Sequence, residues 1–272
     1  MPQKGNYMKF SSCGWWFGGD WYENVTEAKK CGFSALENLS WSNLDLDRAA
    51  DFLKKEEMVN SAILIESTDE SLKGFLEWEH GMVYEDSRKP FIKSFEETVD
   101  ACKKLGVPNI VATSGNERFD IEREKQVEMV ADLLSEFGKI AEQSGICVVF
   151  EPLNVLVDHG GYLISKSSEA FDLIRRVDSP AVKVLFDIYH QQITEGNVIR
   201  NITENIDLIG HFHIADNPGR QEPGTGELNY ANIFSAIKNA GYDGYLAFEC
   251  SPSADAHEVA RKMSEFVAPY EN

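Results

Sequence analysis

The chain has 272 residues, of which 43% are hydrophobic and 11% aromatic, so it can build a sizeable core. Asp and Glu number 45 against 26 Lys and Arg, and the net charge of −19 opposes binding to nucleic acid or to an anionic membrane. The five cysteines are widely spaced and form no Cys-x-x-Cys pair, which is typical of reduced thiols rather than of a disulfide framework or a zinc knuckle.

No segment indicates export or membrane insertion. The first ten residues, MPQKGNYMKF, lack the apolar core of a secretory leader. No uninterrupted apolar run of about 18 residues, the length that crosses a bilayer, occurs in the sequence. We therefore expect a cytoplasmic protein that acts without a membrane.

Strand-like apolar runs alternate with segments of helical periodicity along the whole chain. The eight runs expected to form strands are 9–13, 33–39, 60–67, 109–115, 146–154, 182–190, 209–216 and 244–250. Helical periodicity is clearest over 91–106, 121–145 and 167–177, and glycines suited to a left-handed helix end occur at Gly32, Gly106, Gly145 and Gly241. No glycine-rich phosphate loop follows the first strand. The pattern predicts an α/β fold in which residues 1–272 form a single (β/α)8 TIM barrel rather than an open doubly wound sheet.

Two connections that follow predicted strands are longer than the others. Residues 68–90 follow the third strand, and residues 216–229, rich in Gly and Pro, follow the seventh. In a barrel both would lie at the C-terminal face, where active sites form. The first fits a substrate lid and an additional surface helix equally well, whereas the second is expected to hold a fixed shape.

Four predicted strands end in the same way, with a Phe followed by a polar residue that can bind a metal. These pairs are Phe150-Glu151, Phe186-Asp187, Phe212-His213 and Phe248-Glu249. Because side chains alternate along a strand, each Phe should pack under the helices and each polar partner should point inward. Any one partner could be a helix cap or a satisfied core residue, but four at matched depth favour a site. Carboxylates this close repel unless a cation neutralises them, and a set without thiolate suits Mn²⁺, Mg²⁺ or Co²⁺ better than structural Zn²⁺.

Motifs around these pairs resemble a known family. FEPLN (150–154), FDIYHQQITEGN (186–197), GHFHIADNPGR (210–220) and EPGTGELNY (222–230) resemble hydroxypyruvate isomerase-type proteins and ketose 3-epimerases, which are xylose-isomerase-like TIM barrels. The strong resemblance covers about 146–250. It implies a metal, Mn²⁺ foremost, held by Glu151, Asp187, His213 and Glu249. It also implies that Glu151 and Glu249 form the acid/base pair, that His190 and Arg220 bind substrate, and that the protein is a homodimer or homotetramer.

The chain combines features of both groups. His213 stands where some hydroxypyruvate isomerases carry Gln, so the metal set is the one typical of the epimerases. Val157, however, stands where epimerases place a substrate-binding Glu, and it is followed by Asp158 and His159. Arg220 lies in the NPGR arrangement typical of the hydroxypyruvate group. The substrate pocket therefore matches neither group in full.

The predicted ligand set points to one kind of chemistry. A divalent ion chelated by the carbonyl and adjacent hydroxyl of an α-hydroxy ketone acidifies the neighbouring C–H and stabilises the resulting enediolate. Proton return to the next carbon is isomerisation, and return to the same carbon from the other face is epimerisation. We therefore predict a metal-dependent isomerase or epimerase of a small keto-sugar or hydroxy-keto acid, with a lyase or dehydratase on the same site as the alternative. A third reading, an AP-endonuclease-like nuclease, normally requires a trinuclear zinc cluster and a basic groove, to which six histidines and a charge of −19 are poorly suited.

The remaining candidates receive no assigned role from the sequence. Trp15, Trp16 and Phe17 follow the first strand and fit sugar stacking or a plain core equally. Glu66 fits either the pocket or a helix cap. His211 shares the strand face of His213 but lies about 7 Å deeper.

Overall fold

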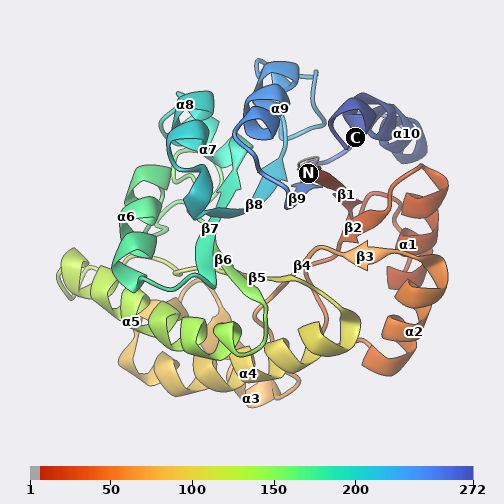
Figure 1. Ribbon diagram of the computed structural model, residues 1–272. Coiled ribbons are helices and arrows are strands. Elements are labelled where there is room, and N and C mark those ends of the chain that lie inside the picture. The colour runs from red at the N-terminus through yellow and green to blue at the C-terminus, as the bar shows by residue number, and fades with distance from the viewer. Residues whose placement is uncertain (1–6, 272) are drawn as a thin grey trace, which may run out of the picture.

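The strands form one parallel sheet wound into a barrel (Figure 1). The computed structural model describes residues 7–271. Most of the first ten residues, which are not expected to form a secretory leader, lie outside this range. The strands, in the spatial order β3-β2-β1-β9-β8-β7-β6-β5-β4, are β1 (Lys9–Cys13), β2 (Ala35–Glu37), β3 (Val59–Asn60), β4 (Ala62–Leu64), β5 (Asn109–Ala112), β6 (Cys147–Phe150), β7 (Val182–Asp187), β8 (Ile209–Ile214) and β9 (Tyr245–Phe248).

The third predicted strand closes the barrel in two short pieces. β3 pairs with β2 and β4 pairs with β5, and Ser61 alone separates them. The Ser61 N–H donates to the carbonyl of Leu36, and the Leu64 N–H donates to that of Leu39. The segment therefore joins both edges of the sheet, and the predicted TIM barrel is confirmed with one interruption.

Helices surround the sheet on its outer side, as Figure 1 shows. They are α1 (Trp21–Lys30), α2 (Leu46–Glu56), α3 (Glu70–Leu76), α4 (Arg88–Leu105), α5 (Arg123–Glu142), α6 (Ser167–Val177), α7 (Ile188–Thr194), α8 (Val198–Glu204), α9 (Tyr230–Asn239) and α10 (Ala256–Val267), with 3₁₀ turns at η1 (Gly81–Val83), η2 (Glu85–Ser87), η3 (Ile206–Leu208) and η4 (Ala268–Tyr270). The three clearest helical predictions correspond to α4, α5 and α6. Gly106 ends α4 at φ +73°, in the left-handed region that glycine tolerates best. Within residues 7–271, no helix combines the length and apolarity needed to span a membrane.

One predicted strand runs into a helix. Residues 182–190 were expected to be a single strand, but β7 ends at Asp187 and α7 begins at the next residue. The Asp187 Oδ1 atom accepts a hydrogen bond from the His190 N–H at 3.0 Å, which caps the new helix. The residues on both sides of the junction are buried and largely apolar, so periodicity gives no mark of the change.

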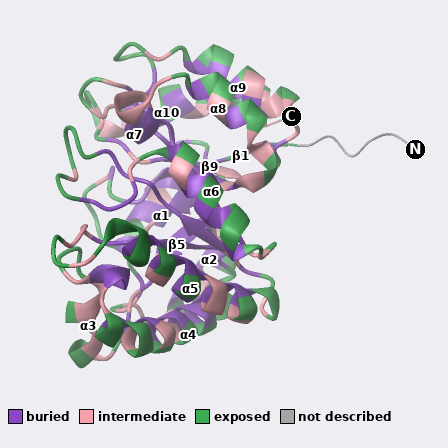
Figure 2. Cartoon of the chain, turned by 90° about the vertical axis from the view of Figure 1, so that its left-hand side faces the viewer, coloured by how far each residue is buried: buried purple, intermediate pink, exposed green. Residues whose placement is uncertain are grey.

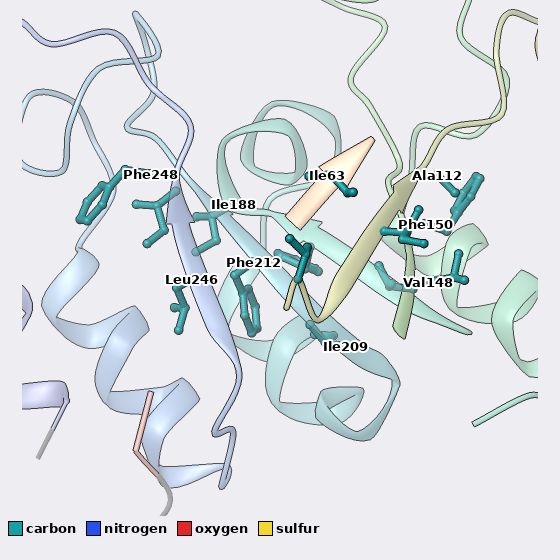
Figure 3. Packing of buried hydrophobic residues seen from close by; sticks show 14 of the residues in the cluster. Ile63, Ala112, Val148, Phe150, Ile188, Ile209, Phe212, Leu246 and Phe248 are labelled. Atoms are coloured by element: carbon teal, nitrogen blue, oxygen red, sulfur yellow. The ribbon is translucent and has the colours of Figure 1, made fainter. Parts of the chain in front are cut away.

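The Phe members of the four pairs pack between sheet and helices, as predicted. Each is at most 1% exposed, and Figure 3 shows Phe150, Phe212 and Phe248 within the buried cluster. A separate small cluster fills the barrel interior, formed by Ala62, Val111, Val149 and Leu185. Side-chain alternation then places Glu151 and Asp187, two residues beyond Val149 and Leu185, inside the barrel near its C-terminal mouth.

Both long connections have a defined structure. Residues 68–90 contain α3, η1 and η2, so the additional surface helix is present. The connection after β8 contains no helix; the Asp216 carboxylate holds it together by accepting from the N–H groups of Asn217, Gly224 and Leu228. Figure 2 shows buried residues running through the middle of the molecule and exposed residues on the outer helix faces and loops.

Candidate active site

The four predicted metal ligands converge at the C-terminal mouth of the barrel. Asp187 and His213 are paired directly across β7 and β8. The His213 Nδ1 atom lies 3.1 Å from Glu151 Oε1, 3.2 Å from Glu249 Oε2 and 4.0 Å from Asp187 Oδ2. Of the four side chains, only that of Glu249 is more than a tenth exposed, at 16%. Strands 26 to 36 residues apart in sequence thus bring three carboxylates around one imidazole nitrogen.

One oxygen of this cluster has no hydrogen-bond partner among the described residues. Asp187 uses Oδ1 to cap α7, and its Oδ2 atom is buried without a hydrogen bond. An unpaired buried carboxylate oxygen is costly, and a divalent cation bound between the carboxylates would satisfy it. Three carboxylates and one imidazole are also the donors that Mn²⁺, Mg²⁺ or Co²⁺ accept. The residues therefore fit a divalent ion.

Two histidines lie close enough to be the nitrogen ligand, and their hydrogen bonds distinguish them. The His190 nitrogen, like that of His213, lies near the carboxylates, within 4.8 Å of donor oxygens on Glu151, Asp187 and Glu249. The His213 Nε2 atom lies 2.7 Å from Glu37 Oε1, so Nε2 keeps a proton, and loss of the Nδ1 proton would leave a lone pair that faces the carboxylates. In His190 it is the protonated nitrogen, Nε2, that faces the carboxylates. His213 is therefore the better metal ligand.

Asn154 determines the tautomer of His190. Its Oδ1 atom accepts from the N–H groups of Val157 and Asp158, which fixes the orientation of the amide. Its Nδ2 atom then donates to His190 Nδ1 at 2.6 Å, so the His190 proton must be on Nε2. That Nε2 atom is buried and has no hydrogen-bond partner in the described chain. Burial also lowers the pKa of His190, although Asp187 opposes this, so the ring is a neutral donor aimed at the site.

Arg220 lies beside the carboxylates. Its Nη2 atom is 2.5 Å from Glu249 Oε2 and 3.6 Å from Asp187 Oδ2, and the guanidinium lies over the Tyr189 ring at 5.2 Å. The backbone of Arg220 has φ +51°, a left-handed conformation that is uncommon outside glycine. The Ser251 N–H donates to its carbonyl, which ties this residue to the loop after β9. The guanidinium is thus held where it could contact a substrate oxygen.

Glu37 is a buried member of the site that the sequence analysis missed. It ends β2 and accepts hydrogen bonds at 2.7 Å from His213, His211 and the Ser61 hydroxyl. Burial opposes its ionisation, but His211 and His213 lower the pKa of Glu37 to about 2. Its carboxylate therefore stays charged and orients His213. No Phe precedes it, so the pattern that marked the other four residues did not include it.

We expect Glu37→Gln to weaken binding of Mn²⁺ by roughly 10- to 100-fold, the usual effect of losing a carboxylate behind a ligating histidine. The amide can accept from only one of the two imidazoles and carries no charge. Calorimetric titration with Mn²⁺ measures the affinity, and circular dichroism checks the fold. Ser61→Ala is the matched control, because it removes a single hydrogen bond to Glu37 and should cost less. An affinity within twofold of the parent protein would contradict the orienting role.

The two predicted catalytic glutamates differ in their electrostatics. Burial raises the pKa of Glu151 to about 7, although His213 opposes it. Burial acts in the same direction on Glu249, but His213 and Arg220 outweigh it and hold the pKa of Glu249 below its usual value. Burial also opposes charge on His213, yet Glu249 and Glu151 raise its pKa well above the usual value. At neutral pH, protonated His213 is therefore the positive partner of the carboxylates.

These shifts predict a pH-dependent metal affinity. An ion at the cluster must displace the proton of His213 and, below about pH 7, that of Glu151, so affinity should rise with pH. Because the pKa of Glu151 is about 7, about one more proton should be released per ion at pH 6 than at pH 8. Calorimetry in buffers of different ionisation enthalpy counts these protons. In Glu151→Gln the difference between the two pH values should disappear, and a pH-independent affinity of the parent protein would refute the expectation.

Several other sequence candidates have structural roles. Trp16 is buried and its Nε1 atom donates to the carbonyl of Cys250 at 2.7 Å, whereas Trp15 is half exposed. The Glu66 carboxylate accepts from the Ser40 hydroxyl and from the N–H groups of residues 41 and 42, so it organises the loop after β2. His159, which received no role from the sequence, lies with its ring centroid 5.2 Å from that of His190.

A (β/α)8 barrel with carboxylates and imidazoles gathered at the C-terminal mouth is the layout of a TIM-barrel enzyme. The chain belongs to the xylose isomerase-like TIM barrel family, whose model matches residues 25–270. It is similar to hydroxypyruvate isomerase of Escherichia coli, with 26% identity over 91% of this chain and 94% of that protein. It is 30% identical to 3-dehydro-D-guloside 4-epimerase of Escherichia coli over 62% of this chain and 66% of that protein. A solved structure from Brucella melitensis, described as an AP endonuclease of family 2, superimposes with a TM-score of 0.85 at 26% identity, over 97% of this chain and 99% of that one.

Proposed function

We propose that this protein is a divalent-metal-dependent isomerase or epimerase of a small keto-sugar or hydroxy-keto acid, with Mn²⁺ as the preferred ion. The observation that carries the proposal is the cluster of Glu151, Asp187, His213 and Glu249, in which Asp187 Oδ2 is buried and has no hydrogen-bond partner among residues 7–271. Named relatives that include an isomerase and an epimerase of small keto compounds support the same reaction class.

Residues around the cluster have separable tasks in this proposal. When bound, the ion would polarise the substrate carbonyl and hydroxyl and so acidify the intervening C–H. Glu151 and Glu249 follow β6 and β9, on different sides of the mouth, so one can remove the proton and the other can return it. His190 donates its Nε2 proton to a substrate oxygen, and Arg220 binds a second oxygen. Because both glutamates also hold the ion, they are weak bases, and this acidification is needed for turnover.

Proton exchange in D₂O tests the proposal. The Mn²⁺-loaded protein is incubated with a panel of ketoses and 2-keto acids, and ¹H NMR follows loss of the signal at the carbon next to the carbonyl. Exchange without loss of water supports an isomerase or epimerase, whereas release of water would identify a lyase acting on the same site. Absence of exchange with every α-hydroxy ketone tested would refute the proposal. The net charge of −19 gives no support to a nucleic-acid substrate.

A further inference from the structure

A cavity of about 320 Å³ lies at the C-terminal ends of β4 and β5, and β5 is the neighbour of β6 in the sheet. Val111 and Thr113 line it, and Val111 also belongs to the cluster that fills the barrel interior. The N–H of Glu151 donates to the carbonyl of Ala112 at 3.0 Å, so Thr113 and Glu151 follow neighbouring strands at the same level. The cavity therefore lies beside the strand end that carries Glu151, although none of the four predicted ligands lines it.

An aromatic wall connects the cavity with His190. Trp78 lines the cavity, is 39% exposed and stacks on His159 with ring centroids 4.9 Å apart. The His159 ring is in turn 5.2 Å from that of His190. The Trp78 carbonyl accepts from the Asn116 N–H at 2.8 Å, which fastens the wall to the segment after β5. A flat, partly exposed indole in a fixed position is suited to the apolar face of a sugar.

The segment that carries Trp78 also packs closely, backbone against backbone, on the segment after β5. Gly81 has φ +66°, and a Cβ atom there would lie 2.6 Å from the Ser114 carbonyl oxygen and 2.7 Å from the Gly115 Cα atom. The Met82 N–H donates to the Ser114 carbonyl at 2.9 Å. A side chain at position 81 would separate the two segments. The Trp78 side chain is therefore carried by a segment that is packed against residues 114–116, and not by a free loop.

The lining of the cavity is part apolar and part polar, and among the described residues it offers no free positive charge. Its hydroxyl and amide groups come from Ser42, Asn43, Ser67 and Thr113. Thr113 is partly exposed and lines the cavity, and its hydroxyl has no hydrogen-bond partner among residues 7–271, so it can bind a ligand. Lys73 is the one cationic residue of the lining, and its ammonium is 2.6 Å from Glu70 Oε1. Glu66 and Glu77 add negative charge, so the cavity disfavours an anionic group.

The half of the mouth that contains the carboxylate cluster also disfavours an anionic group. Glu37, Glu151, Asp187 and Glu249 bring four carboxylates to this half, and the described cation beside them is the Arg220 guanidinium, which contacts Asp187 and Glu249. Adding one divalent ion still leaves this half with net negative charge when both inner histidines are neutral. A substrate carboxylate would therefore meet no excess of positive charge.

We propose that this cavity is a subsite for an uncharged, hydroxyl-bearing segment of the substrate, so that the substrate is a polyhydroxy ketone of sugar size rather than a three-carbon keto acid. The inference rests on the proposed function, because it assigns the reacting end to the carboxylate cluster. The volume of the cavity lies at the lower end of the range for small-molecule sites and is sufficient for a sugar-sized group. A three-carbon substrate held at the cluster would leave the subsite to water.

Substrate comparison tests the assignment directly. The Mn²⁺-loaded protein is supplied with hydroxypyruvate, with free ketoses of five and six carbons, and with methyl glycosides that carry a ring ketone, and kcat/KM is measured by proton exchange. We expect an uncharged substrate of one of the latter two kinds to exceed hydroxypyruvate at least about tenfold, and the two arms separate an open chain from a ring. Equal or better turnover of hydroxypyruvate would overturn the inference.

Two variants probe the wall and the free hydroxyl. Trp78→Ala and Thr113→Val should each lower kcat/KM for the preferred sugar about tenfold more than for hydroxypyruvate, corresponding to about 1.4 kcal/mol. Phe119→Ala, which alters an aromatic side chain that is 96% exposed and outside the cavity lining, is the matched control. Equal losses for both substrates, or no loss for either, would contradict the subsite.

Binding without turnover separates the two proposals. Saturation-transfer NMR with sorbitol and methyl β-glucoside on the metal-free protein should show binding that Trp78→Ala weakens and Phe119→Ala does not. If these compounds bind in this way but no substrate exchanges protons, the subsite stands and the proposed function fails. If hydroxypyruvate exchanges protons but no polyol binds, the proposed function stands and the subsite is refuted.

Discussion

Glu151→Gln and Glu249→Gln should each lower kcat by about 10²- to 10⁴-fold, the contribution typical of a positioned acid or base. The substitution keeps the shape of the side chain but removes the group that accepts a proton. Both residues contact His213 at 3.1 and 3.2 Å, so each change also removes one negative charge from around the ion. Proton exchange at the substrate carbon, measured at saturating Mn²⁺, reports the loss.

The control for this experiment is Glu227→Gln. Glu227 is an exposed glutamate of the loop after β8, where it accepts from the side-chain amides of Gln192 and Asn217, and its replacement should leave kcat within twofold. Circular dichroism and thermal melting verify that the cluster variants are folded. Near-native turnover of either purified cluster variant would exclude that glutamate from proton transfer.

Removing the metal should abolish turnover and lower the melting temperature. Without the ion, the imidazolium of His213 and the guanidinium of Arg220 are the positive partners that the described residues offer the three carboxylates of the cluster. An ion present at about 100 times its dissociation constant would stabilise the fold by about 2.7 kcal/mol, which corresponds to roughly 5–10 °C for a chain of this size. Dialysis against EDTA followed by titration with Mn²⁺, Mg²⁺ or Co²⁺ measures both effects.

A matched variant distinguishes site binding from general ionic effects. In Asp187→Asn the carboxylate with the unbonded buried oxygen is replaced by a neutral amide, so added Mn²⁺ should no longer raise the melting temperature. The parent protein and the variant are compared at equal ionic strength. Full turnover after chelation, with elemental analysis showing no residual metal, would refute metal dependence.

Much of the barrel can be predicted from the sequence, because the sequence patterns that indicate it are local. Alternation of strands and helices, the glycines after helices and the four Phe pairs each depend on residues close together in the chain. The boundary at Asp187 is different. The residues of β7 and of the start of α7 are both buried, and only the hydrogen bond from the His190 N–H to Asp187 shows where the helix begins.

The predicted ligands and their inward direction were determined by the sequence alone, because strand periodicity and barrel geometry place strand ends at one mouth. Tertiary structure decided which histidine nitrogen carries a proton, because Glu37 reaches His213 from 176 residues away. It also decided the shape and charge of the cavity beside the cluster, whose walls come from segments following β2, β4 and β5. Hydrogen-bond partners and cavity walls depend on contacts between distant segments, and no periodic pattern in one segment encodes them.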